Sequence, residues 1–237
     1  MRNTASEKPK TNNGIKIMVG FLFDNDGVLI DSSKMHWLSW ELLMKEEDDA
    51  FMDHRGFVSC FGKRNDLILK ELLPNVPQKK RDYLAKRKEE LFRECARGKI
   101  TLLDGMENFL SQVKEANIPR AIASSTPIEN LEMYITSTVL GKYFDHYLSA
   151  EQCAHGKPYP DIFIKAAETI GYKPEECIVF EDAPAGIEAA RRAGCFIVAL
   201  ATTHKKADLK DYDLIYNDAT KLDLQEILEA YSVKIIE

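Results

Sequence analysis

The chain has 237 residues and a formal net charge of −6 at pH 7, with 45% hydrophobic and 30% charged residues. This composition is ordinary for a globular protein built as one large domain, or as a core with a modest insert. It excludes the overall basic field that favours nucleic-acid binding, and no apolar run approaches the length that spans a membrane.

Cysteine usage and the first residues indicate the compartment. The five cysteines are scattered with no Cys-x-x-Cys pair, and a chain of this length needs no disulfides for stability. Residues 1–14 are polar and lack the apolar segment of a secretory signal, so we expect a flexible tail there. The sequence therefore predicts a cytoplasmic protein, and nothing in it demands more than a monomer.

The first predicted strand is an apolar run over 15–23 that leads into Asp24-Asn25-Asp26-Gly27. Residues two apart in an extended chain share a face, so Asp24 and Asp26 should project to the same side. Two carboxylates there repel each other unless a cation or a shared proton lies between them. The alternative is a turn in which one Asp caps the backbone and the other is solvated.

The next segment, 33–99, is helical in composition and forms a predicted insert. Helices are expected over 33–47, 65–73 and 78–97, the first capped by Ser32 or Ser33. Near its start His36 stands beside two Trp residues, where it is either packed or close to a site. Basic residues at 79–81 and 86–88 indicate a solvated helix face, with a phosphate clamp as the alternative.

From residue 100 onward, predicted helices and strands alternate. Helices are expected at 107–116, 127–137, 161–170, 184–193 and 222–231, and strands at 118–123, 146–149, 177–180, 195–200 and 213–217. This alternation predicts right-handed crossovers and a doubly wound, Rossmann-like α/β fold with a parallel sheet covered on both faces. The core should comprise 15–32 and 100–237, with its functional site at the carboxyl ends of the strands.

Three later segments carry candidate chemistry. Thr126 and Glu129 form a capping-box pattern around Pro127, which leaves the Ser124 hydroxyl at a strand end beside a helix N-terminus. Such a position is a ready anion site, although Ser124 could serve turn geometry alone. Lys157 precedes a proline, so the chain offers it from a stiff, non-helical loop; a lone lysine of this kind is otherwise solvated.

The third of these segments is Val179-Phe180-Glu181-Asp182, another apolar strand that ends in two acids. If this strand neighbours the first one, up to four carboxylates converge, and only a hard cation makes that arrangement stable. Mg²⁺ prefers oxygen ligands of this kind. An acidic protein that acts on an anionic substrate needs such a local cation.

In this order the segments resemble the four motifs of the haloacid dehalogenase-like hydrolases. The run from Phe23 to Ser32 resembles the first motif of their phosphatase and phosphomutase branch, since the dehalogenases lack the second Asp. Ser124 matches the second motif, Gly156-Lys157-Pro158 the third, and Glu181-Asp182 the fourth. The resemblance is strongest to the β-phosphoglucomutase-like branch, which includes sugar-phosphate phosphatases and carries a helical cap at the position of 33–99.

The resemblance implies an Mg²⁺-dependent phosphatase that hydrolyses a small phosphomonoester, such as a sugar or polyol phosphate. Asp24 would be the nucleophile that forms an aspartyl-phosphate, Asp26 the general acid and base, and Ser124 and Lys157 the groups that hold the phosphoryl oxygens. The expected metal ligands are Asp24, the Asp26 carbonyl, Asp182 and Glu181, the last directly or through water. The expected substrate contacts are Asn25, Ser125, Thr126, His36 and Arg64.

Two alternatives stay open. A β-phosphoglucomutase-like mutase would have an Arg at a fixed step after a cap Gly, where this chain has Asn65 next to Arg64, and an Asn where it has Ile128. Both departures favour hydrolysis. The second alternative is a catalytically silent binding module on the same fold, which the intact motif residues argue against.

Overall fold

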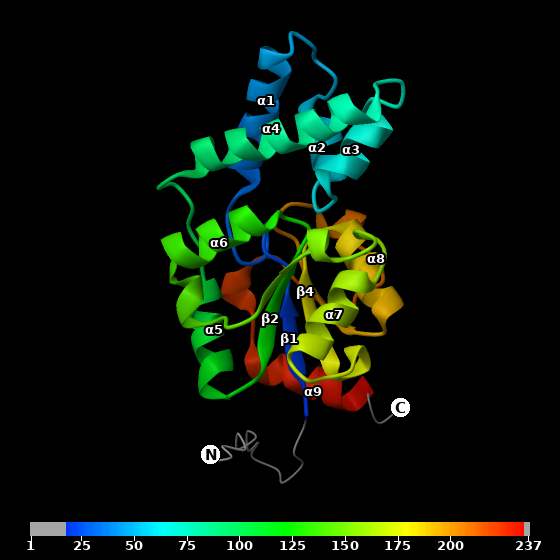
Figure 1. Cartoon of the computed structure of the whole chain (residues 1–237). Helices are drawn as coiled ribbons and strands as arrows, with labels where there is room; N and C mark the ends of the chain where they lie inside the picture. Colours follow the sequence, from blue (N-terminus) through cyan, green and yellow to red (C-terminus); the bar gives the residue numbers. More distant parts are fainter. Residues whose placement is uncertain (1–17, 235–237) are drawn as a thin grey trace, which may run out of the picture.

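The computed structural model describes residues 18–234, and its centre is a six-stranded sheet with the order β3-β2-β1-β4-β5-β6 (Figure 1). The strands are β1 (Gly20–Phe23), β2 (Arg120–Ser124), β3 (Tyr147–Ser149), β4 (Cys177–Glu181), β5 (Phe196–Leu200) and β6 (Leu214–Tyr216). Every neighbouring pair is parallel. The predicted doubly wound α/β fold is confirmed.

Strand residues alternate between the two faces of the sheet, and helices cover both. Phe21 and Phe23 belong to the apolar core on one face, with α5 (Met106–Glu115), α6 (Ile128–Ser137) and α9 (Leu224–Lys234). Leu22 lies in the core on the other face, which α7 (Asp161–Thr169) and α8 (Pro184–Ala193) cover (Figure 1). This period of two is the strand signature, and it leaves β1 buried on both sides.

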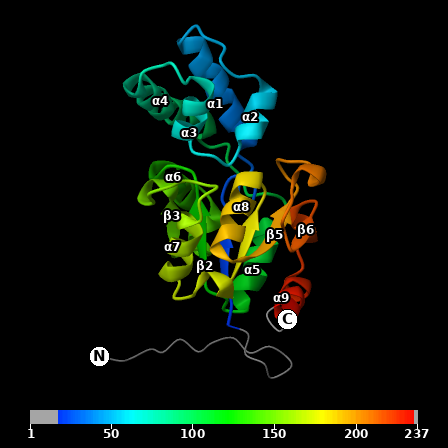
Figure 2. The same cartoon turned by 90° about the vertical axis from the view of Figure 1, so that its right-hand side faces the viewer.

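The four remaining α-helices of residues 18–234 form a cap above the carboxyl ends of the strands (Figure 2). They are α1 (Ser33–Glu46), α2 (His54–Cys60), α3 (Asn65–Leu72) and α4 (Gln78–Ala96), and they lie between β1 and α5 in the chain. The cap has an apolar core of its own, which includes Trp40, Phe57 and Leu69. The boundaries at 33 and 99 stay predictions.

Two short linkers join the cap to the core, and they run side by side. Ile30 pairs with Leu102 in an antiparallel bridge. The amide of Asp31 donates to the carbonyl of Thr101 at 3.0 Å. The cap therefore leaves and re-enters the core at one place, beside the loop that follows β1.

Several local predictions are wrong. The first strand, predicted over 15–23, begins at Gly20, so residues 18 and 19 are not part of it. Residues 15–17 and the predicted tail lie outside the described residues. Ser32 occupies the N-cap position of α1, but its hydroxyl makes no capping bond and donates to Asp26 at 2.6 Å. Thr126 likewise donates to Asp26, and Pro127 is the N-cap of α6 rather than its first residue. In both cases the hydroxyl that was expected to cap a helix donates a hydrogen bond to the buried carboxylate of Asp26 instead.

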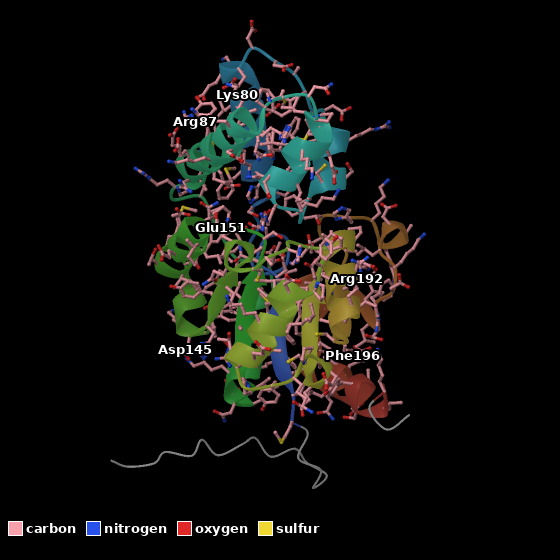
Figure 3. All side chains as sticks on the ribbon, turned by 45° about the vertical axis from the view of Figure 1, so that its right-hand side comes forward. Lys80, Arg87, Asp145, Glu151, Arg192 and Phe196 are labelled. Carbon is pink, nitrogen blue, oxygen red and sulfur yellow. The ribbon has the colours of Figure 1, made fainter. Side chains whose placement is uncertain are left out.

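The basic run in α4 is only partly a solvated face. Lys80 and Arg87 pair with Glu47 and Glu46 at the end of α1, on the outside of the cap (Figure 3). Lys88, in contrast, is 2% exposed and points inward. Within the described residues no helix has both the length and the apolarity needed to cross a bilayer.

Candidate active site

The acidic strand ends of β1 and β4 meet, because these two strands are neighbours in the sheet. One carboxylate oxygen from each of Asp24, Glu181 and Asp182 lies within 4.8 Å of the others, and all three residues are buried. The predicted convergence of carboxylates therefore exists. The carboxylate of Asp26 is not part of this cluster.

Lys157 is the cation that the sequence predicted at this cluster. Its Nζ atom donates to Oδ1 of Asp24 at 2.6 Å and to Oε1 of Glu181 at 2.5 Å, and the side chain is fully buried. The peptide bond between Lys157 and Pro158 is cis. Burial opposes the charge on Lys157, but Asp24 and Glu181 outweigh it and hold the pKa of the amine above its ordinary value. The site thus has one permanent cation against three carboxylates.

The excess of negative charge shows in the acids themselves. Burial, with a further contribution from Glu181 and against the opposing effect of Lys157, raises the pKa of Asp24 from 3.8 to about 7. Burial and the charges of Glu181 and Asp24 raise the pKa of Asp182 well above its ordinary value. A further cation at this place would keep both carboxyl groups ionised at neutral pH.

The donor atoms fit a divalent metal ion. Oδ1 of Asp182 is buried without any hydrogen-bond partner, which is costly unless a cation binds it. Glu181 has no such free oxygen: Oε1 accepts from Lys157, and Oε2 accepts from the amides of Asp182 and Ala183 at 2.8 and 2.9 Å. An all-oxygen set of this kind suits Mg²⁺. Asp182 is therefore the better direct ligand, and Glu181 orients its neighbours.

Asp26 lies in a separate set of hydrogen bonds. Its Oδ1 accepts from Ser32 at 2.6 Å, from Tyr134 at 2.9 Å and from His36 Nε2 at 3.2 Å, while Oδ2 accepts from Thr126. Burial opposes ionisation of Asp26, but His36 and the two hydroxyls of Ser32 and Thr126 hold its pKa well below 3.8. Burial and the adjacent carboxylate raise the pKa of Tyr134 well above 10, so the phenol stays a donor.

From Asp26 the contacts continue into the cap. Lys88 Nζ lies 2.6 Å from Nδ1 of His36. Since an ammonium can only donate, Nδ1 accepts, and the ring proton sits on Nε2, which donates to Asp26. Lys88 also pairs with Glu89 at 2.8 Å. The predicted substrate residue His36 thus contacts Asp26 instead of standing free.

Glu89 ties the cap to the core. Its carboxylate accepts from Asn65 in the cap and from Asn130 in core helix α6, both at 2.5 Å. Arg93 of α4 donates to the amide oxygen of the same Asn130 at 2.9 Å. Two residues of α4, Glu89 and Arg93, therefore form hydrogen bonds to the buried side chain of Asn130 in the core.

Sequence reasoning missed Lys88, Glu89, Asn130 and Tyr134. A signal existed for the first of these, because Lys88 falls on the helical stripe of Leu84, Leu91, Phe92 and Cys95, all of which are buried. A charged residue on such a stripe needs a buried partner. Tyr134 reaches Asp26 across 108 positions of sequence, and no local pattern predicts that contact.

A cavity of about 540 Å³ opens between the cap and the strand ends. The predicted site residues that line it are Asp24, Asp26, His36, Arg64, Ser124, Ser125 and Thr126. Four other predicted site residues do not line it, because they are fully buried: Asn25, Lys157, Glu181 and Asp182. Glu151 marks the rim where the core meets the cap (Figure 3).

Ser125 and Arg64, like the other lining residues described above, have protein partners. Ser125 donates to the Gly62 carbonyl in the cap at 2.8 Å. Arg64 makes two hydrogen bonds to Asp66, at 2.7 and 2.9 Å. The guanidinium predicted to contact substrate is therefore already paired with a carboxylate.

Comparison with known proteins decides the family. The family model described as haloacid dehalogenase-like hydrolase matches residues 18–194. The chain belongs to this family. Hexitol phosphatase A from Escherichia coli is 31% identical over 205 residues, which cover 86% of this chain and 92% of that protein.

Two further similarities bear on this hydrolase. The crystal structure of a β-phosphoglucomutase from Clostridium difficile has a TM-score of 0.81 at 27% identity, with 92% of this chain and 99% of that one covered. A chloroplastic 5-amino-6-(5-phospho-D-ribitylamino)uracil phosphatase from Arabidopsis thaliana is 32% identical over 226 residues, 92% of this chain, and the chain spans 59% of that relative's length. The β-phosphoglucomutase-like branch and the enzyme class, a haloacid dehalogenase-like phosphatase, were both predicted from the motifs and are confirmed.

Proposed function

We propose that this hydrolase removes the phosphoryl group from a small phosphomonoester, a sugar or polyol phosphate, with Asp24 as its nucleophile. One observation carries the proposal. The buried ammonium of Lys157 bridges Asp24 and Glu181, and the unpaired Oδ1 of Asp182 lies in the same cluster. Such a cluster can hold both the attacking carboxylate and the oxygens of a phosphate in a water-poor site.

In the first step an oxygen of Asp24 forms a bond to phosphorus, and the ester bond to the leaving alcohol breaks. The product is an aspartyl-phosphate, which water then hydrolyses to free Asp24 and inorganic phosphate. Lys157 donates to Asp24 before the reaction and to a phosphoryl oxygen as charge develops there. Ser124, buried at the end of β2 and lining the cavity, is placed to donate to a second oxygen.

Asp26 moves the protons. As an ionised carboxylate it accepts the proton of the water that attacks the aspartyl-phosphate. To protonate the leaving alcohol it must first be protonated, and a bound phosphate dianion nearby favours this because like charges raise the pKa of a carboxyl group. Tyr134, Ser32 and Thr126 donate hydrogen bonds to the Asp26 carboxylate. These bonds stabilise the ionised form and weaken when Asp26 carries the proton.

The residues that would hold Mg²⁺ are Asp24, Asp182 and the backbone carbonyl of Asp26. When bound there, the ion offsets the negative charge shared by the carboxylates and the phosphate. Glu181 supports this site from behind, since Lys157 and two backbone amides occupy its oxygens. Its contact with the ion through water stays a prediction.

Charges in the cap favour hydrolysis over a mutase reaction. A mutase holds the second phosphate of a bisphosphate intermediate, which requires a free cation at the cap end of the cavity. Here Asn65 lies against Glu89, while Lys63 pairs with Glu71 at 2.9 Å and Arg64 with Asp66. Lys63 and Arg64 are therefore already neutralised, while Lys86 and Arg93 also line the cavity. The pairing of Arg64, the residue next to the mutase position, supports a substrate with one phosphate.

The relatives support the same class. Hexitol phosphatase A is named for polyol phosphates, and the Arabidopsis phosphatase is named for a ribityl phosphate. A hydroxyl-rich leaving group without a second phosphate fits a cavity in which Lys63 and Arg64 are already paired. The cytoplasmic location and the monomeric state remain predictions from the sequence.

A phosphate-release assay tests the proposal. Purified protein is incubated with a panel of hexitol, pentitol and sugar monophosphates, with Mg²⁺ or with excess chelator. We expect turnover of at least one polyol or sugar monophosphate, loss of turnover with chelator, and loss in Asp24→Asn. Wild-type rates in Asp24→Asn would reject the mechanism, and no turnover across the panel would reject the substrate class.

A further inference from the structure

We propose that the loop Thr202–His204, which follows β5, positions the carboxylate of Asp182 for metal binding, and that Thr203 is its principal positioning residue. The inference rests on the proposed metal site. It concerns residues outside the four motifs, in the loop after a strand that does not neighbour β1.

The first observation is the hydrogen bond from the Thr203 hydroxyl to Oδ2 of Asp182. The other oxygen, Oδ1, is buried and has no partner. A donor on one oxygen restricts rotation of the carboxylate and leaves the second oxygen in the cluster with Asp24 and Glu181. A carboxylate that binds a metal ion commonly has one oxygen on the ion and the other on an outer hydrogen-bond partner, and Asp182 is arranged in this way.

The second observation concerns the backbone of Asp182. Nδ1 of His204 lies 3.1 Å from the Asp182 carbonyl oxygen. Since a carbonyl can only accept, Nδ1 carries the proton and donates to it. His204 is largely buried, so the imidazole is held in place by packing. Consecutive residues of the loop thus hold the main chain and the side chain of one acid.

The third observation links the loop to the nucleophile. The Thr202 hydroxyl donates to the carbonyl of Gly27, three residues after Asp24. Gly27 has a φ of 84°, and a Cβ atom there would lie 2.0 Å from Oδ2 of Asp182 and 2.8 Å from Cγ2 of Thr203. The loops after β1, β4 and β5 are therefore in direct contact at this point.

These contacts give the loop a physical task. Asp24 and Asp182 repel each other when ionised, and without restraint they would separate in the absence of a cation. The Thr202–His204 loop forms hydrogen bonds to the segments that carry both residues, at Gly27 after Asp24 and at Asp182 itself. It thereby holds the distance between the two carboxylates before the ion arrives, so less ordering remains to be done on binding.

The experiment measures Mg²⁺ binding by titration calorimetry on the full chain, stripped of metal. Thr203→Val removes the hydroxyl and keeps the shape, whereas Thr203→Ser keeps the hydroxyl. Loss of an outer partner typically weakens metal binding about 10- to 100-fold, so we expect a rise of that size in Kd for Thr203→Val and near wild-type affinity for Thr203→Ser. Thr169→Val, which removes an exposed hydroxyl that bonds only within α7, is the matched control.

Circular dichroism in chelator establishes that each variant is folded. If Thr203→Val does not fold, Thr203→Ala and His204→Gln carry the same test. A folded Thr203 variant without the hydroxyl that binds Mg²⁺ as tightly as wild type overturns the positioning role and leaves the proposed function intact. Absence of Mg²⁺ binding by the wild type overturns the metal site and the positioning role together.

Discussion

Nζ of Lys88 lies 2.6 Å from Nδ1 of His36, so a buried ammonium on cap helix α4 sets the tautomer of the ring that donates to Asp26. The same ammonium pairs with Glu89, which holds Asn130 in the core. Asn130 and Tyr134 both belong to α6, and Tyr134 donates to Asp26. The polar contacts therefore form a closed ring through the cap and back, with the proposed general acid and base as one of its members.

The Lys88–Glu89 pair predicts a non-additive effect on stability. Lys88→Met leaves the carboxylate of Glu89 buried without its cation, and we expect the free energy of unfolding to fall by about 3–5 kcal/mol. The double variant Lys88→Met/Glu89→Gln removes both charges and should recover a large part of that loss. Urea denaturation of the wild type, of Lys88→Met, of Glu89→Gln and of the double variant measures the coupling. Equal losses in the single Lys88 variant and in the double variant would show that no unpaired charge is involved.

The pKa of Asp24 predicts how the metal-free protein responds to pH. Between 3.8 and about 7 the folded protein keeps a proton on Asp24 that the unfolded chain has lost. Since the folded state then binds more protons, its stability decreases as pH rises through that window. Asp182 acts in the same direction. In chelator, the thermal midpoint should thus be higher at pH 5 than at pH 7, and Mg²⁺ should raise it more at pH 7.

Asp24→Asn is the control for this pH effect. The amide does not titrate, so its midpoint should depend less steeply on pH over the same window. A variant with the same pH dependence as wild type would assign the effect to other groups.

Gly186 predicts a steric effect on the Lys157 site. A Cβ atom at this position would lie 1.7 Å from Oε1 of Glu181, the atom that accepts from Lys157. Gly186→Ala must therefore displace that carboxylate, and we expect phosphate release to fall on the order of 10²-fold. The control is Gly56→Ala in cap helix α2, where the nearest atom is 3.2 Å away. Equal activity in the two variants would mean that Glu181 moves without consequence.

The paired charges of the cap predict a change in ligand preference. Asn65→Arg combined with Glu89→Gln adds a cation to the cap end of the cavity and removes the carboxylate that would neutralise it. We expect hexose bisphosphates to inhibit phosphate release at lower concentration in this variant than in wild type, by about tenfold or more for a close ion pair. Asn75→Arg, on an exposed loop, adds the same charge elsewhere. Unchanged inhibition constants would place the second phosphate outside this region.

Much of the fold was predictable because its signals are local. Alternating helices and strands indicate parallel crossovers, and acids that follow apolar strands indicate the functional edge. Asp24 and Asp182 follow two such strands, Lys157 lies in a loop between them in the chain, and the sheet order brings the three together. The sequence pattern does not give that order, and the adjacency of the two acidic strands entered the prediction only as a condition.

The two failed capping predictions share one cause, which is competition from the buried carboxylate of Asp26. Ser32 and Thr126 both have cap-like local sequence, and an N-cap bond contributes about 1 kcal/mol. An unsatisfied buried carboxylate costs more than that, so both hydroxyls donate to Asp26 instead. Local patterns contain no information about a partner that approaches from elsewhere in the chain, and the contact of Lys88 with His36 was missed for the same reason.

The paired linkers at Ile30 and Leu102 have a consequence for how this architecture changes over evolutionary time. Because both connections cross at a single point, one insert can replace another without rewiring the sheet or shifting the acids beneath it. Mutations that reshape the cap away from His36, Lys88 and Glu89 can then accumulate without disturbing the contacts of Asp26 at the strand ends. A scaffold divided in this way can take on new metabolites while it keeps one reaction.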